Sequence, residues 1–230
     1  MWRGRMQLAD DGRWCGKMMT KTIANPEIFK FMDTDQKQLY YGACQRWYPT
    51  TWQRLSGCGP CTASNIMYYL THTGPSPQEG FQSRSEWVAL MQELWKYVTP
   101  SLKGVNKMSM LYEPSVAFAQ TKGISLEVKR CEVPEEMQRR PSLAEVVDFL
   151  AEALDQDAPV AFLNWCNGEV KNLDRWHWVN IIQLEFDEEK KKAYGTLLDE
   201  GQIKKIDLAL WLKTSTLGGG FVYFRKAGSL

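Results

Sequence analysis

The chain has 230 residues, 44% of them hydrophobic and 24% charged, and its formal net charge at pH 7 is +1. These values are typical of a globular protein that is long enough to bury a substantial core. They argue against a nucleic-acid-binding surface, and the lack of any run of about 18 apolar residues argues against a membrane-spanning helix.

The first residues bear on location and on the state of the cysteines. Met1–Met6 carries two arginines, and Asp10 and Asp11 follow without the apolar stretch that a secretory signal needs. We therefore expect a cytoplasmic protein whose six cysteines are mostly reduced. Because these cysteines form no repeated C-x-x-C motif and no cluster with histidine, we expect neither a bound metal nor a cofactor.

The N-terminal quarter of the chain is the hardest part to assign. Residues 1–55 have weak periodicity and several turn signals, so we expect irregular structure with one or two short helices. Residues 60–72 predict a helix, because Pro60 suits the first helical position. The apolar residues that follow share one helical face: Ala63, Ile66, Met67 and Leu70.

The remaining elements change in type along the chain. Helical periodicity returns over 84–98, 112–121 and 142–155. Ser142 and Glu145 form a capping box at the start of the last of these helices. β-rich runs bounded by turns then predict strands, with a short helix over 206–213 between the last two: 125–131, 159–165, 176–186, 193–198 and 221–224.

Helices followed by strands indicate an α+β fold, with the helix of residues 60–72 packed against an antiparallel sheet. We expect one domain over residues 1–230. Within it, residues 1–44 are an N-terminal extension without an assigned role, 45–122 form a mainly helical half, and 123–230 form a mainly β half.

The most informative motif is Gly57-Cys58-Gly59-Pro60-Cys61, because two chemistries could use it. Two thiols flanking Gly-Pro resemble a dithiol redox centre. A single cysteine at the start of a helix is also suited to nucleophilic catalysis, since unpaired N–H groups there favour the thiolate. We expect Cys58 to lie just outside the helix as the nucleophile, and Cys61 to be mainly a packing residue, although it remains a rival nucleophile.

The chain has two histidines, and they differ in their suitability as a base. His72 ends the helix that Cys58 begins, so the helix separates the two by roughly 18 Å. His177 opens a predicted strand and has tryptophan on both sides, which could shield it from water. We therefore expect His177 to be the general base.

A third group is expected to orient the histidine. If 176–186 and 193–199 form a hairpin, Asp199 at the end of the second strand lies beside His177. Asn164, Asn180 and Asp174 are weaker substitutes for this role. The backbone N–H of Cys58 and a side-chain amide are expected to stabilise the oxyanion, with Gln53 favoured over Gln45 because it is nearer in sequence.

These residues resemble the papain-like cysteine peptidase superfamily, above all its bacteriocin-leader-processing (C39-like) branch. The similarity lies in Gln53, the Gly57–Pro60 element, the His177-Trp178-Val179 strand and Asp199, and it extends over about residues 45–224. It implies a papain-like domain in which Cys58 is the nucleophile, His177 the base, Asp199 its orienting partner and an upstream glutamine the oxyanion donor. In that branch the glutamine stands further from the cysteine than Gln53 does, which leaves Gln45 open.

The resulting expectation is a cysteine peptidase or amidase that acts by thiolate acyl transfer on a peptide or amide. Acyl transfer to an amine in place of water is compatible with the same residues. The alternatives are a dithiol oxidoreductase that uses Cys58 and Cys61, and a binding protein on the same fold that has no catalytic activity. The polar segment before Cys58 differs from the buried strand that precedes a thioredoxin-type site. The sequence leaves substrate identity and oligomeric state open.

Overall fold

The computed structural model describes residues 18–33, 37–73 and 80–227, and its central element is an antiparallel sheet of seven strands. Six of them lie in the order β4-β9-β5-β6-β7-β8, and β1 also pairs with β6. The strands are β1 (Met18–Thr22), β4 (Leu126–Val133), β5 (Val160–Asn164), β6 (His177–Asp187), β7 (Lys192–Asp199), β8 (Gln202–Asp207) and β9 (Gly219–Lys226). A separate ribbon pairs β2 (Lys30–Asp33) with β3 (Gln38–Tyr41).

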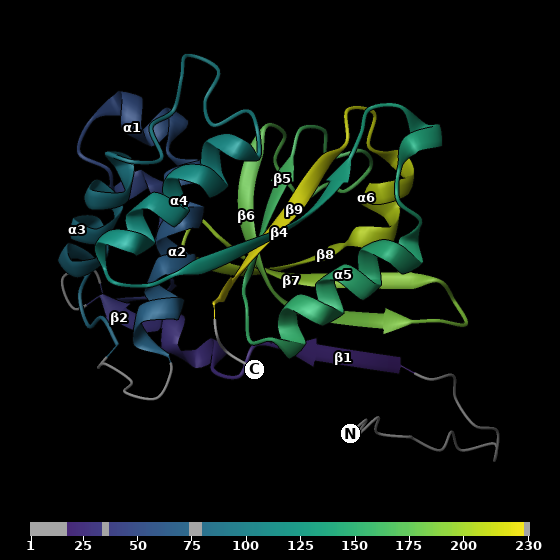
Figure 1. Cartoon of the computed structure of the whole chain (residues 1–230), viewed down its shortest axis with the longest axis horizontal. Coiled ribbons are helices and arrows are strands. Elements are labelled where there is room, and N and C mark those ends of the chain that lie inside the picture. The colour runs from purple at the N-terminus through teal and green to yellow at the C-terminus, as the bar shows by residue number, and fades with distance from the viewer. Residues whose placement is uncertain (1–17, 34–36, 74–79, 228–230) are drawn as a thin grey trace.

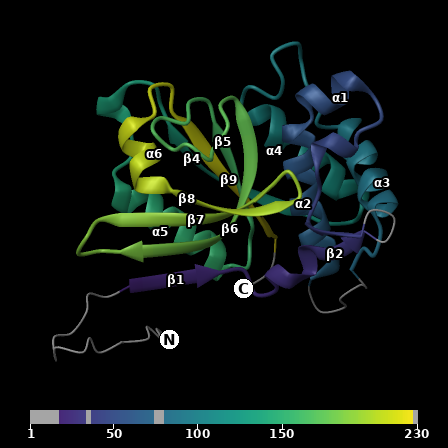
Figure 2. The same ribbon diagram turned by 180° about the vertical axis from the view of Figure 1, so that it is seen from behind.

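The helices fall into two groups, which both ribbon views separate (Figures 1 and 2). One group gathers at one side of the molecule and comprises α1 (Thr51–Ser56), α2 (Cys58–His72), α3 (Arg84–Trp95) and α4 (Ser109–Thr121). The other group lies with the sheet and comprises α5 (Leu143–Asp155) and α6 (Leu208–Thr214). Over the described ranges, no helix combines the length and apolar character needed to cross a membrane.

The middle of the sheet is buried on both faces. Along β5, Val160 and Phe162 belong to the apolar cluster that includes α5 and α6 side chains. Ala161 and Leu163 belong instead to the cluster that includes α2 and α4 side chains. Because successive strand residues point to opposite faces, this alternation places helices against both sides of the sheet.

The expected α+β architecture is confirmed, with the Cys58-bearing helix packed on an antiparallel sheet. The main helices begin and end near the expected residues, and the capping box of Ser142 and Glu145 is present at the start of α5. One boundary differs where it matters: α2 begins at Cys58, so this residue is the first residue of the helix and Gly57 is its N-cap.

The short helix α1 agrees with the one or two short helices expected within residues 1–55, whereas four short strands were not expected from the sequence, namely β1, β2, β3 and β8. The strand β8 is an example, because its sequence Gln-Ile-Lys-Lys-Ile-Asp contains little apolar signal. It lies at the edge of the sheet, where lysines are common because they discourage pairing with other chains.

The described part of the N-terminal extension belongs to the core. β1 pairs with residues 183–187 of β6, directly beyond the stretch of β6 that pairs with β5. Ile23 and Phe29 are fully buried, and Phe31 and Tyr40 are nearly so. The expectation about a secretory signal falls on residues 1–17, which lie outside the described residues.

Candidate active site

Cys58 occupies the first position of α2, and its side chain is half-buried. The first N–H groups of a helix have no acceptor within that helix, and they carry partial positive charge. A thiolate or an oxyanion at this position would therefore be stabilised by α2.

The two glycines that flank Cys58 are required by close packing. A Cβ atom on Gly57 would lie 2.7 Å from the ring of Tyr48, and one on Gly59 would lie 2.7 Å from the side chain of Val105. Gly59 is buried, so Val105 rather than a substrate fills the space beside it. These contacts fix the backbone on both sides of the sulfur.

A pair of buried amides holds α2 against β6. Asn65 Nδ2 donates to Asn180 Oδ1 at 2.9 Å, and Asn180 Nδ2 donates to the carbonyl of Thr62 at 3.2 Å. The indole N–H of Trp178 adds a third link, because it donates to the carbonyl of Val105 at 2.6 Å. The strand that begins at His177 is thus hydrogen-bonded to the helix that begins at Cys58 and to the segment packed on Gly59.

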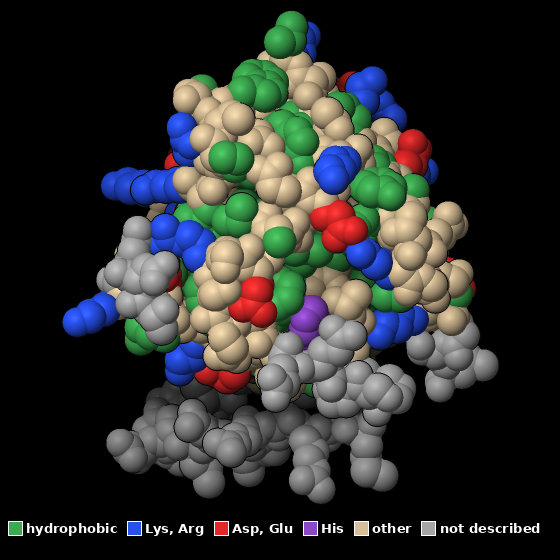
Figure 3. Space-filling view, turned by 90° about the vertical axis from the view of Figure 1, so that its left-hand side faces the viewer, with side chains coloured by type: hydrophobic (Ala, Val, Ile, Leu, Met, Phe, Trp, Pro, Cys, Tyr) green, Lys and Arg blue, Asp and Glu red, His purple; other side chains and the backbone are tan. Residues whose placement is uncertain are grey.

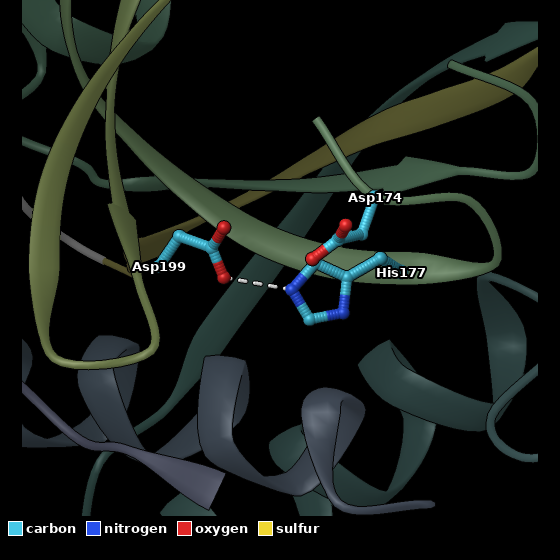
Figure 4. Close-up of side chains that lie close together, drawn as sticks. All are labelled: Asp174, His177 and Asp199. Carbon is cyan, nitrogen blue, oxygen red and sulfur yellow. Dashed lines mark hydrogen bonds and ion pairs between the residues drawn. The ribbon is translucent and has the colours of Figure 1, made fainter. Parts of the chain in front are cut away.

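Asp199 lies beside His177, and Asp199 Oδ1 is 2.7 Å from His177 Nε2 (Figure 4). The register of the β6–β7 pair explains this contact, since Asn180 faces Leu198 and the start of β6 therefore meets the end of β7. His177 is 8% exposed and Asp199 is 4% exposed, so water competes little for their hydrogen bond.

The second ring nitrogen of His177 faces Cys58. Figure 4 shows this nitrogen on the side of the ring away from Asp199, and an interaction with the Cys58 side chain contributes to raising the pKa of the histidine. Since Nε2 is bonded to Asp199, the nitrogen directed at the sulfur is Nδ1. The arrangement therefore brings together a half-buried thiol, an imidazole and a buried carboxylate.

Electrostatics favour the charged forms of His177 and Asp199. Burial alone lowers the pKa of His177, but the interactions with Asp199 and Cys58 outweigh it and raise the pKa to about 10. Burial raises the pKa of Asp199, but His177 and Lys204 outweigh it and hold that pKa below its usual value. Opposite charges at short range stabilise each other's ionised forms in this way.

Lys204 is part of this charge cluster and was missed by the sequence analysis. Its Nζ lies 2.6 Å from Asp199 Oδ2, so the two oxygens of this carboxylate are shared between Lys204 and His177. The tight turn between β7 and β8 makes the contact possible, because Glu200 and Gly201 both have positive φ. This Glu-Gly turn was the available signal, since it predicts a hairpin that returns the chain past Asp199.

Asp174, His177 and Asp199 also form a group with the composition of a metal site. One potential ligand atom from each lies within 4.8 Å of the other two, and Asp174 approaches the ring from another side than Asp199 (Figure 4). Because Asp199 already binds both His177 and Lys204, the geometry favours a hydrogen-bonded charge cluster over metal ligation.

The two glutamines considered as oxyanion donors are hydrogen-bonded elsewhere. Gln53 Oε1 accepts from Thr50 as part of a capping box on α1, and Gln53 Nε2 donates to Gln92 Oε1 at 3.1 Å. Gln45 Nε2 donates to the carbonyl of Arg54 at 3.1 Å. Among the described residues neither amide is hydrogen-bonded to Cys58, so the oxyanion role of Gln53 remains a prediction.

The other orienting candidates have different partners. Asn180 joins α2 to β6, as described above. Asn164 Nδ2 donates to the carbonyl of Asp174, and Asn164 Oδ1 accepts from the indole of Trp211 at 2.7 Å. Both asparagines therefore stabilise the surroundings of His177 without contacting its ring through a hydrogen bond.

Two further thiols, those of Cys61 and Cys166, and the second histidine lie in other environments. Cys61 is 6% exposed, and burial raises its pKa well above the usual value, which makes it a poor nucleophile. Cys166 is 3% exposed; burial raises its pKa, but hydrogen bonds from Thr216 and others lower it to about 6. His72 lies at the far end of α2, where it stacks against Tyr68.

Comparison with known proteins gives a likeness of fold. No family model and no curated protein sequence matches the chain. Among solved structures, UfSP from C. elegans matches with a TM-score of 0.50 and 11% sequence identity over 90% of this chain. The fold is papain-like.

At 11% sequence identity, this likeness concerns the fold alone. The chain spans about a third of the length of that neighbour, because the match covers 34% of it. The neighbour does not support the expected bacteriocin-leader-processing branch.

Proposed function

We propose that the chain is a cysteine peptidase or amidase that acts by acyl transfer through a thiolate. Cys58 is the nucleophile, His177 is the general base and acid, and Asp199 orients the imidazole. The observation that carries the proposal is the position of the His177 ring, which is bonded to Asp199 through Nε2 and faces Cys58 with its other nitrogen.

In the proposed reaction, the proton of the Cys58 thiol is held on Nδ1 of His177 and the sulfur attacks the carbonyl carbon of the substrate. The backbone N–H of Cys58 at the head of α2, with Gln53 as the proposed second donor, stabilises the oxyanion. As the C–N bond breaks, His177 gives its proton to the leaving amine and a thioester remains. His177 then deprotonates a water that releases the acid, and the sulfur recovers a proton.

Asp199 holds the imidazole in place throughout this cycle. Its bond to Nε2 fixes the ring orientation and stabilises the imidazolium, as expected for the third member of a triad. Lys204 limits how far Asp199 raises the basicity of His177, because it shares the same carboxylate. The same residues would serve transfer of the acyl group to an amine instead of water.

The first experiment measures the reactivity of each thiol. Wild-type protein is treated with iodoacetamide at pH 7, and mass spectrometry quantifies alkylation at each cysteine separately, so that Cys166 is not mistaken for Cys58. We expect Cys58 to react at least about ten times faster than N-acetylcysteine, because an adjacent imidazolium and a helix N-terminus favour the thiolate. His177→Ala should remove that advantage.

The second experiment separates the peptidase from the dithiol and binding alternatives. Hydrolysis of a mixed library of peptidyl coumarin amides is compared between Cys58→Ala and the matched variant Cys61→Ala. We expect Cys58→Ala to lose about 10³-fold or more of the activity and Cys61→Ala to retain most of it. A dithiol oxidoreductase would not hydrolyse these amides in any variant and would instead form a reversible Cys58–Cys61 disulfide. An unreactive Cys58 with no hydrolysis would indicate a binding protein.

A further inference from the structure

A cleft of about 320 Å³ opens beside Cys58. Its volume lies within the range of ligand-binding clefts, roughly 300–1,000 Å³. Three tryptophans contribute to its lining, namely Trp52 of α1, Trp165 after β5 and Trp176 immediately before His177. The cleft is therefore walled by residues from both halves of the fold and has the candidate nucleophile in its lining.

The rim of this cleft is unusually apolar for a protein surface. Leu102 is 93% exposed, Leu55 is 75% exposed, and Trp176 and Trp52 are 62% and 43% exposed. All four side chains line the same cleft. Exposed hydrophobic side chains also gather over the α1 side of the molecule (Figure 3). A cluster of exposed apolar side chains around a cleft marks a binding site, whereas isolated ones do not.

Trp176 is held in a strained conformation at this rim. Its φ is 53°, in the left-handed region that bulky residues rarely adopt. Such strain persists only where the surrounding structure imposes it, and it concentrates at functional sites. Here it accompanies a large apolar ring that stays exposed next to the buried His177.

The charge of the residues that line the cleft also affects which substrate side chains can bind there. Among the residues that the structure describes, no aspartate or glutamate lines this cleft, and Lys103 is the one basic residue in its lining. Lys103 is exposed and, within the described ranges, forms no ion pair. A lysine or arginine side chain entering the cleft would meet a like charge and no carboxylate, so it would be disfavoured.

We propose that this cleft binds a bulky apolar side chain of a peptide substrate and rejects a basic one, with Trp176 and Lys103 as the residues that determine this specificity. The occupant is the acyl part of the substrate, because Cys58 lies in the lining and the scissile carbonyl must reach its sulfur. This inference rests on the proposed function for the assignment of the occupant, while the side-chain preference follows from the cleft alone.

The test uses two parallel peptide series built on an acetylated alanine tetrapeptide. A single leucine is moved through the four positions in one series, and a single lysine is moved through them in the other. Wild-type protein is assayed with the coumarin amides of these peptides for kcat/KM. The inactive Cys58→Ala variant is titrated calorimetrically with the corresponding carboxamides, which measures binding without catalysis.

We expect one position at which leucine exceeds lysine at least tenfold in both kcat/KM and affinity. Trp176→Ala should reduce that ratio below about threefold, because the apolar wall is lost. Lys103→Glu should raise the affinity for the lysine peptide at this position, because the repulsion becomes attraction. Met18→Ala is the matched control. Met18 is likewise an apolar residue with a largely exposed side chain, 53% exposed, but it pairs with Asp187 at the opposite end of β6.

The outcomes distinguish this inference from the proposed function. Hydrolysis with no leucine preference at any position, or a preference that survives Trp176→Ala, overturns the inference and leaves the peptidase standing. Selective binding of the leucine peptide without hydrolysis supports the cleft and removes the peptidase. If the protein neither binds nor hydrolyses any peptide of the two series, the inference is overturned.

Discussion

At the scale of single residues, the two nitrogens of His177 have separate tasks. Nε2 is bonded to Asp199, so the ring cannot turn without breaking a buried hydrogen bond. In the proposed mechanism, Nδ1 is left to exchange a proton with Cys58. This division makes the ionisation of His177 the property on which the proposed chemistry depends.

The two histidines of the chain should titrate in opposite directions. The pKa of His72 is lowered by burial, whereas the interactions of His177 with Asp199 and Cys58 overcome its burial and raise its pKa to about 10. NMR of the two Cε1–H resonances should show one signal titrating below pH 6.5 and the other well above it. In Asp199→Asn the second signal should move to lower pH, because the carboxylate that favours the imidazolium is gone. Two signals near pH 6.5 in wild-type protein would contradict the ion-pair description.

The same shift has a consequence for stability. An unfolded histidine has a pKa of about 6.5, and the folded value for His177 is about 10. The folded state therefore binds the proton more tightly, and this contribution to stability is complete below about pH 6.5. It should be lost as the pH rises toward 10, and urea unfolding across this range should show a smaller loss in His177→Gln.

Cys58, His177 and Asp199 could be proposed as a group from the sequence, because local patterns in the sequence indicate where each of them lies in the fold. The glycines around Cys58 and the two consecutive strands that bring Asp199 to His177 are visible in the sequence. The side chains of Gln53, Lys204 and Trp176 depend on contacts or backbone angles that no short motif reports. Gln53, for example, is bonded to Gln92 of α3, 39 positions away.

At the scale of elements, the position of α2 on β6 decides whether the candidate residues meet. Asn65 and Asn180 join the two elements in the protein interior, and both are almost completely buried. Their hydrogen bonds also fix the register, because sliding the helix along the strand would leave Asn65 Nδ2 and both polar atoms of the Asn180 amide without these partners. A buried amide without a partner costs about 1–3 kcal/mol.

Removing one member of this pair should therefore be costly. Asn180→Ala should destabilise the fold by about 2–3 kcal/mol, because Asn65 Nδ2 and the carbonyl of Thr62 lose their partner. Asn172→Ala, which removes an exposed amide bonded to the carbonyl of Lys205, should cost under about 1 kcal/mol. Urea unfolding measures both, and similar small losses would show that the buried pair does not fix the helix.

The elements that sequence analysis found are the long and strongly patterned ones. α5 has an apolar face and a capping box, so its start was predicted to within a residue. α1 and β8 are six residues each and largely polar, so their local patterns carry little information. Pairing with neighbouring elements stabilises them, and a single sequence does not display that pairing.

At the scale of the whole molecule, residues 18–33 and 37–44 form part of the core of the fold and do not lie over its surface as a separate cover. β1 occupies the sheet position beyond the end of β5, and Lys21 is 2.6 Å from Asp155 of α5. Ile23 and Phe29 enter the same core cluster as α5 and β6. Sequence analysis left this segment unassigned because its strands are short and its turns frequent.

A comparison of one buried and one exposed residue of this segment tests whether the segment is an integral part of the fold. Ile23→Ala should lower the free energy of unfolding by about 2–5 kcal/mol, because it empties a fully buried site. Met18→Ala should change it by less than about 0.5 kcal/mol, since Met18 is largely exposed. A small effect for both in a urea titration would show that the segment detaches without disturbing the core.

The amide link between Asn65 and Asn180 spans 115 positions of the chain. Contacts of such long range form late in folding, because a large loop must close before they contribute. A partly folded or nascent chain would then carry a thiol with no imidazole beside it. On the proposed function, peptidase activity would therefore arise only once the tertiary structure is complete.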